Sequence, residues 1–322
     1  MTNYTGIQGQ NILIVSSDPA NPTEGQIWYN STSNLLKGYQ FAAVNAWASG
    51  GNMNTGRETM GDFGAQTSSI AAGGSPPTNA SESYNGTSWT STSPINTTRY
   101  DIAGAGASNT SGIIFGGNTP PFSATESWNG TSWTSVNSLN SSRSEIAGIG
   151  TQTAAIAAGG NPVGGPTNIT ESWNGTSWTT LPATLPTSVR NAASSGIQTA
   201  GLIFGGVATA VTGVTQSWNG STWSTPPATL NTARRDLGGS SSGTQTAALA
   251  FGGNINPPVV ASTELYNGTS WTTTTSMATA RTGLGGTGTQ TSALAFGGPP
   301  GPLAVTEEWT GSTLATKTIT VS

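Results

Sequence analysis

The charged side chains of this sequence recur at fixed places and are the first candidates for chemistry. An arginine follows each aromatic segment by about ten residues, at Arg57, Arg99, Arg143, Arg190, Arg234 and Arg281. A glutamate recurs within these segments, at Glu82, Glu126, Glu171, Glu264 and Glu307, where Gln216 interrupts the series. Six arginines around one mouth of a ring would bind an anionic group such as a carboxylated sugar. We favour the alternative, in which each arginine pins a strand or loop, because the charge recurs as architecture does.

Paired carboxylates would be the other route to chemistry. Asp62, Asp101, Glu145 and Asp236 occupy similar places in different repeats, so no single pair stands out as a general acid and base. In an extended chain Asp101 would pair locally with Arg99. The sequence contains no His and no Cys, which excludes an imidazole base, a thiolate nucleophile and Cys- or His-ligated metal. We therefore expect no enzymatic activity, no catalytic residues, no cofactor and no metal site.

Composition excludes further classes of protein. The 322 residues include 45 Gly and 18 Pro, and only 7% are charged, with a net charge of −4. Phosphate binding needs clustered Lys and Arg, so nucleic acid is not an expected partner. No apolar stretch approaches the roughly 18 residues of a membrane-spanning helix, and the first residues do not resemble a signal peptide. A soluble protein without membrane insertion is expected.

The positioning elements follow from an internal repeat. Six Gly-Gly pairs each close a short apolar run, at intervals of 43, 43, 46, 47 and 45 residues. Their second members are Gly74, Gly117, Gly160, Gly206, Gly253 and Gly298. Each pair precedes a loop and then a segment of the kind Thr-Glu-Ser-Trp-Asn-Gly-Thr-Ser-Trp. Periods of this length are typical of solenoids and propellers.

Each repeat contains two hairpin signals. Asn129-Gly130 indicates a tight turn between two short strands, because both residues tolerate positive φ. With these two residues at the centre of the turn, Trp128 faces Thr131, and Glu126 faces Trp133. A second hairpin of small residues precedes each Gly pair. Four short strands per repeat and six repeats predict an all-β fold, a six-bladed β-propeller with a short N-terminal hairpin or arm.

The repeated tryptophans have two interpretations. Aromatic faces stack on sugar rings, but nine of the 11 Trp stand at the repeated aromatic positions, where packing between sheets explains them better. The second aromatic of the repeat is Trp89, Trp133, Trp178, Trp223 and Trp271, and Leu314 stands at this place in the last copy. The variable loops after the Gly pairs are the better binding candidates, since recognition usually lies on loops of a rigid scaffold.

The order of apolar run, Gly-Gly, loop and two spaced aromatics resembles the kelch repeat over residues 57–320. In kelch proteins the Gly pair ends the second strand, and the two aromatics lie on the third and fourth. This resemblance implies the propeller fold and says little about function. The copper oxidases and sialidases built on propellers use residues that this sequence lacks at the matching places.

The N-terminal segment differs from the repeats. Gly25 to Tyr39 looks like the short hairpin module of bacteriophage tail and fibre proteins, and the repeats resemble kelch-type repeats of marine phage virion proteins. Residues 1–33 are expected to be an attachment arm, with the apolar run Ile12, Leu13, Ile14 and Val15, and Trp28, as contact residues. The propeller would span residues 34–322. Strands within 35–50 are either an appendage or, as we favour, complete the last blade.

These resemblances imply a structural virion component, on a tail, fibre or capsid surface, synthesised in the host cytoplasm. Its expected partners are other virion proteins through the N-terminal segment, and a glycan or protein of the host surface through the loops. The alternatives are a carbohydrate-binding or depolymerising propeller, with the sugar in the ring mouth, and a cytoplasmic kelch scaffold, which we disfavour because partner-recruiting domains are missing.

Overall fold

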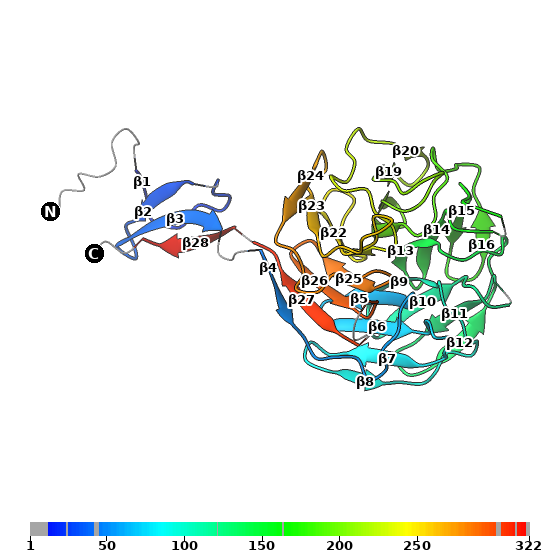
Figure 1. Ribbon diagram of the computed structural model, residues 1–322. Coiled ribbons are helices and arrows are strands. Elements are labelled where there is room, and N and C mark those ends of the chain that lie inside the picture. The colour runs from blue at the N-terminus through cyan, green and yellow to red at the C-terminus, as the bar shows by residue number, and fades with distance from the viewer. Residues whose placement is uncertain are drawn as a thin grey trace. The chain divides into compact units, whose positions relative to one another are not determined.

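The computed structural model describes residues 12–23, 25–41, 45–120, 122–162, 164–300, 304–312 and 314–319. The chain forms two compact units, a small unit of Met1–Asn45 with Thr310–Ser322 and a large unit of Ala46–Trp309 (Figure 1). The boundary lies about a dozen residues beyond the one expected at residue 33. Among the described residues no helix is long and apolar enough to cross a membrane.

The large unit is a ring of six four-stranded antiparallel sheets, as predicted (Figure 1). Blades 1 to 3 consist of β5 (Gly61–Ala65), β6 (Ser68–Ala72), β7 (Ser81–Tyr84) and β8 (Trp89–Ser91); β9 (Ala103–Ser108), β10 (Ser111–Phe115), β11 (Thr125–Trp128) and β12 (Trp133–Val136); and β13 (Ala147–Thr151), β14 (Ala154–Ala158), β15 (Thr170–Trp173) and β16 (Trp178–Thr180). The first strands of neighbouring blades contact one another, so they line the central axis.

Blades 4 to 6 repeat this order with one change of connectivity. They consist of β17 (Ala193–Ile197), β18 (Ala200–Phe204), β19 (Thr215–Trp218) and β20 (Trp223–Ser224); β21 (Gly238–Gly239), β22 (Ala248–Phe251), β23 (Thr263–Tyr266) and β24 (Trp271–Thr274); and β25 (Gly285–Thr289), β26 (Ser292–Phe296), β27 (Thr306–Thr310) and β4 (Ala46–Ser49). The fourth strand of blade 6 thus comes from the other end of the chain. This confirms the favoured closure of the ring by an N-terminal strand.

The closing strand also supplies the tryptophan that the sixth repeat lacks. The indole Nε1 of Trp47 donates to Thr263 Oγ1 at 3.0 Å, as Trp89 Nε1 does to Thr306 Oγ1. The ring of Trp47 packs edge-on against Phe251, 5.0 Å away. The assignment of the second aromatic of blade 6 to Leu314 was therefore wrong, because that residue pairs in another sheet.

The small unit is a sheet of four strands, β1 (Leu13–Val15), β2 (Ile27–Asn30), β3 (Leu35–Phe41) and β28 (Leu314–Thr318), in that order. β1 lies parallel to β2, and β28 antiparallel to β3. The segment 35–50 is thus divided between the two units. β3 pairs with β2 and β28 in the small sheet, whereas β4 joins the propeller. Residues 1–11 and 24 of the expected arm lie outside the described residues.

The outer hairpins differ in register from the prediction. Trp128 pairs directly with Trp133 and Glu126 with Ser135, so the loop has four residues. Within it the Asn129 side chain accepts hydrogen bonds from the backbone N–H groups of residues 131 and 132. Of Asn129 and Gly130 only the glycine has positive φ, which a type I′ turn would require of both.

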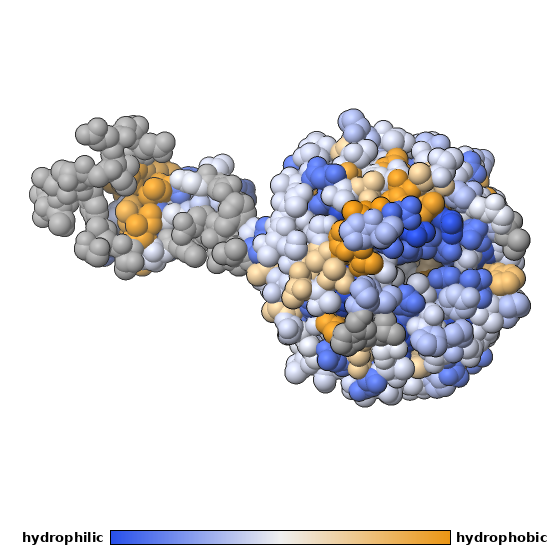
Figure 2. All heavy atoms as spheres, viewed as in Figure 1, coloured by the Kyte–Doolittle hydropathy of each residue, from blue (hydrophilic) through white to orange (hydrophobic). Residues whose placement is uncertain are grey.

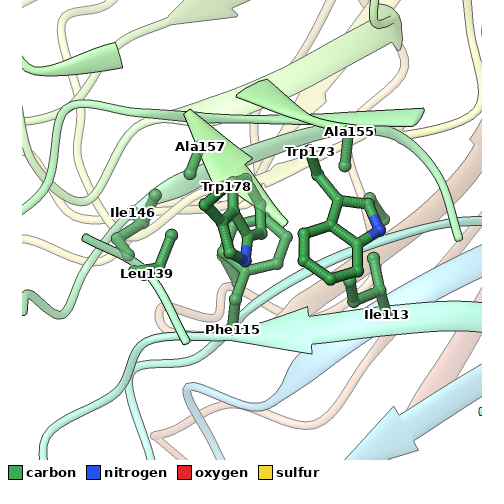
Figure 3. Packing of buried hydrophobic residues seen from close by; sticks show 10 residues of the cluster. Ile113, Phe115, Leu139, Ile146, Ala155, Ala157, Trp173 and Trp178 are labelled. Carbon is green, nitrogen blue, oxygen red and sulfur yellow. The ribbon is translucent and has the colours of Figure 1, made fainter. Parts of the chain in front are cut away.

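The apolar core lies between blades, as the repeat predicts. Figure 3 shows one cluster, in which Phe115 of blade 2 packs against Trp178 of blade 3. The two ring centroids are 4.8 Å apart at an interplanar angle of 65°, an edge-to-face geometry that aromatic pairs favour. The repeated indoles are all buried, which confirms that they are core.

Polar links join each blade to the next. The N–H of the second Gly in each pair donates to a carbonyl on the segment that enters the following blade, as from Gly74 to Arg99 and from Gly298 to Arg57. At the other end of the blades, Gln152 Nε2 donates to Trp128 O of the preceding blade. Gln66 Nε2 donates to Trp309 O at 2.8 Å, and this contact joins blade 1 to blade 6.

Candidate functional site: the axial cavity of the propeller

Five of the six arginines considered as a ring around one mouth of the propeller lie instead in buried ion pairs. The pairs are Arg57–Glu82, Arg99–Glu126, Arg143–Glu171, Arg234–Glu264 and Arg281–Glu307. Each glutamate also accepts backbone N–H groups of the segment entering its blade, as Glu126 does from residue 96 at 2.7 Å. Burial lowers the pKa of these arginines, and the adjacent glutamate opposes the shift. The repeated charge is therefore an internal lattice that positions the loops.

Blade 4 departs from this lattice, and the sequence register was one residue off there. Val189, not Arg190, occupies the arginine position, because its carbonyl accepts from Gly160 as those of the arginines accept from the other Gly pairs. The glutamate position of this blade is Gln216, whose amide both accepts from and donates to the backbone of Thr187. Arginine and glutamate are thus replaced together, which leaves no buried charge without a partner.

A second ring of residues surrounds the axis, two positions after the arginines. It consists of Thr59, Asp101, Glu145, Asn191, Asp236 and Gly283, which all have φ between 51° and 58°. The backbone N–H of each member donates to the backbone carbonyl of the preceding member, at 2.8 to 3.1 Å. Asp101 is the exception, because its N–H donates to Thr59 Oγ1 at 3.4 Å. The expected local pair of Arg99 with Asp101 does not form, because the left-handed residue turns the chain away.

Two cavities lie on either side of this ring, which we call the axial ring. The inner one has a volume of about 130 Å³, and Ile102, Ile146, Leu237 and Asp62 are among the residues that line it. The outer one, the mouth, has a volume of about 280 Å³. Its lining includes Ser75 and Asn254, each of which follows a Gly pair and begins a variable loop. The loops expected to carry recognition therefore contribute to the rim of the mouth.

A loop of blade 5 crosses the axis at the opposite end. Ser242 Oγ donates to Gly64 O of blade 1 at 2.8 Å, and its backbone N–H donates to Gly288 O of blade 6 at 3.0 Å. This loop shortens β21 to two residues. The loop therefore obstructs the axis at that end.

The mouth mixes acidic and basic side chains. Arg190 Nη1 lies 2.7 Å from Glu145 Oε2, and Arg235 Nε lies 3.6 Å from Asp236 Oδ2. Burial raises the pKa of Asp101 to about 6, and the charge of Glu145 adds to the shift. Burial likewise raises the pKa of Asp236 to about 6, while Arg235 opposes it. These carboxylates are held close together in a partly dehydrated space.

Asp62 lies deeper, in the inner cavity. Burial raises the pKa of this carboxyl to about 7, although Gly286 N donates a hydrogen bond to Oδ2. In the sequence it seemed equivalent to Asp101, but it follows Arg57 by five residues, whereas Asp101 follows Arg99 by two. Among the described residues no group of three or more His, Cys, Asp or Glu is placed to hold a metal ion.

The predicted attachment residues of the small unit differ in exposure. Leu13 and Ile14 on β1 are exposed, by 51% and 71%, whereas Ile12 and Val15 are half-buried. Trp28 is buried, and its Nε1 donates to Asp18 Oδ1 at 3.0 Å. Lys37 Nζ also contacts Asp18, and this hydrogen bond lowers the pKa of Asp18 to about 2. Trp28 therefore supports the unit from within and is not a contact surface.

The axial ring was not predicted from the sequence, although its residue types carry a signal. The position two residues after the arginine, counted from Val189 in blade 4, carries Thr, Asp, Glu, Asn, Asp and Gly, types that include the usual left-handed residues Asn, Asp and Gly. Neither a protein-family model nor a curated protein matches this chain.

Proposed function

We propose that this chain is a non-enzymatic structural component of a bacteriophage particle, in which the small unit attaches to other virion proteins and the propeller displays loops to the host surface. The observation that carries the proposal is the unequal distribution of exposed apolar side chains. Among the described residues Leu13, Ile14 and Leu35 of the small unit are exposed, against Ile197 of the propeller. Figure 2 shows apolar residues at the surface of both units; the difference lies in the large side chains that are strongly exposed.

Exposed apolar residues on a short edge strand favour a partner. β1 has three residues, and among the described strands it lies at one edge of its sheet. The resemblance of residues 25–39 to a phage hairpin module supports attachment through this unit. The repeated charges support a scaffold, because the described Arg–Glu pairs of the repeat are internal and hold loops in place.

Incorporation into particles tests the proposal. Purified particles of the source phage should contain the chain, as detected by mass spectrometry and located by cryo-electron microscopy. The variant Leu13→Asp/Ile14→Asp should fold but fail to incorporate, whereas the matched control Ile197→Asp should incorporate normally. Absence of the wild-type chain from particles would refute the proposal.

The carbohydrate-binding or depolymerising propeller remains the second candidate, and the mixed polar lining of the mouth favours it. Sugars bind through hydroxyl groups that donate and accept, and the mouth offers both carboxylate and guanidinium groups. Release of oligosaccharide from a host polysaccharide would separate depolymerisation from binding.

A further inference from the structure

We propose that the mouth of the propeller holds a binding site for a neutral saccharide end group, in the sector formed by blades 4 and 5. Repeated residues build the ring, so departures from the repeat are where a single asymmetric ligand would be recognised. The inference rests on the second candidate function, sugar binding by the propeller, and does not depend on attachment to a particle.

The departures gather on one side of the axis. Blade 4 has lost the internal arginine and glutamate, and it places Arg190 in the mouth. The next position inward is Ala192, where other blades carry Met60, Ile102, Ile146, Leu237 and Leu284. Blade 5 places a second cation, Arg235, in the same mouth.

The axial ring carries backbone strain that its architecture does not require. Gly283 shows that glycine fits this position and makes the same ring hydrogen bonds. Nevertheless Glu145 and Thr59 are held at φ of 56° and 51°, which is uncommon for glutamate and unfavourable for a β-branched residue. Residues other than glycine that are held in a strained backbone conformation, at a position that glycine could occupy, are typical of functional sites.

The pairing of charges selects the class of ligand. Glu145 lies beside Arg190, and Asp236 beside Arg235, so the mouth offers both hydrogen-bond acceptors and donors. An anionic ligand would face these carboxylates together with Asp101, and a cation would face both guanidinium groups. Adjacent hydroxyl groups donate to carboxylates and accept from guanidinium groups without bringing a charge into the cavity.

The size of the site fits one end group. The mouth measures about 280 Å³, slightly below the roughly 300–1,000 Å³ of typical small-molecule pockets. The inner cavity is smaller than the mouth, so the ligand occupies the mouth and rests on the axial ring. Further sugar units would extend toward the variable loops at the rim.

Titration of the full chain with monosaccharides tests the site. Isothermal calorimetry and saturation-transfer NMR would use neutral hexoses, the corresponding uronic acids and amino sugars, and CaCl₂ as separate arms. We expect saturable binding of at least one neutral hexose, weaker binding of its charged relatives and none of Ca²⁺. No binding by any sugar, or binding of only the amino sugars or Ca²⁺, would overturn the proposal.

Two variants and a control distinguish recognition from folding. Asp236→Gly installs the residue found at 283, so it should preserve the ring and raise the melting temperature while weakening sugar binding by about tenfold or more. Arg235→Gln should weaken binding similarly. Ile197→Ser, at the far end of β17, should change neither. Unchanged affinity in both mouth variants would place the sugar elsewhere and refute the site.

Discussion

The coupling between Arg99 and Glu126 offers the sharpest test of the internal lattice. The guanidinium contacts Glu126 Oε1 at 3.0 Å and also donates to the carbonyls of Gly116 and Ala124, at 2.7 and 2.6 Å. Blade 4 shows what replaces such a pair, since Val189 and Gln216 occupy the same two places. The corresponding variants are Arg99→Val, Glu126→Gln and the double change.

Each single change leaves a buried charge without its partner and should cost about 3–5 kcal/mol of unfolding free energy. The double change leaves no charge. It loses two hydrogen bonds to carbonyls at about 1 kcal/mol each, and some packing, so it should cost about 3 kcal/mol. The double variant is therefore expected to be no less stable than the worse single variant, although independent effects would add to about 6 kcal/mol or more.

Denaturant unfolding followed by tryptophan fluorescence measures these differences. The reciprocal change in blade 4 provides a matched control. Val189→Arg alone should destabilise the protein, and addition of Gln216→Glu should recover most of the loss. Additive costs for the Arg99 and Glu126 changes would refute the argument that the two charges are retained as one unit.

Three further predictions follow from the axis, the closing strand and the blade links. Because burial raises the pKa of Asp62 to about 7 and of Asp101 to about 6, the folded state holds protons that the unfolded state releases near its ordinary pKa. The two carboxyls contribute to the free energy of unfolding fully below about pH 4, and this contribution is lost as the pH rises through 6 and 7. The melting temperature of the wild-type protein should therefore fall between pH 5 and pH 8, and Asp62→Asn should make this fall smaller. Trp47→Ala removes the indole of the closing strand and should lower the free energy of unfolding by about 3–5 kcal/mol, measured by urea unfolding. A loss below about 1 kcal/mol would contradict closure of the ring by β4. Gly206→Ala would place a Cβ 2.5 Å from Arg190 O at a positive φ, so a lower melting temperature is expected, and an unchanged one would contradict this packing.

The repeat made most of the fold predictable. Glycine pairs and aromatics recur because every blade must pack on its neighbour in the same way, and this periodicity is visible without coordinates. The closing strand was predictable for the same reason, since Trp47 precedes Arg57 by the spacing of the other repeats.

The misassigned features depend on local geometry that types and spacing do not fix. The hairpin register was wrong because the Asn129 side chain caps a four-residue loop. Arg190 was misassigned because a one-residue shift of register is invisible when Val189 stands beside it. The mouth could not be predicted, because its members are brought together only when six segments meet around the axis.

Hydrogen exchange on the full chain tests the closed ring most directly. β4 pairs with β27, and Gly50 N donates to Thr306 O at 2.9 Å just beyond it. The backbone amides of β4 should therefore exchange as slowly as those of the equivalent outer strands β8, β12 and β24. Exchange of β4 at the rate of an unpaired linker, while those strands remain protected, would contradict the ring.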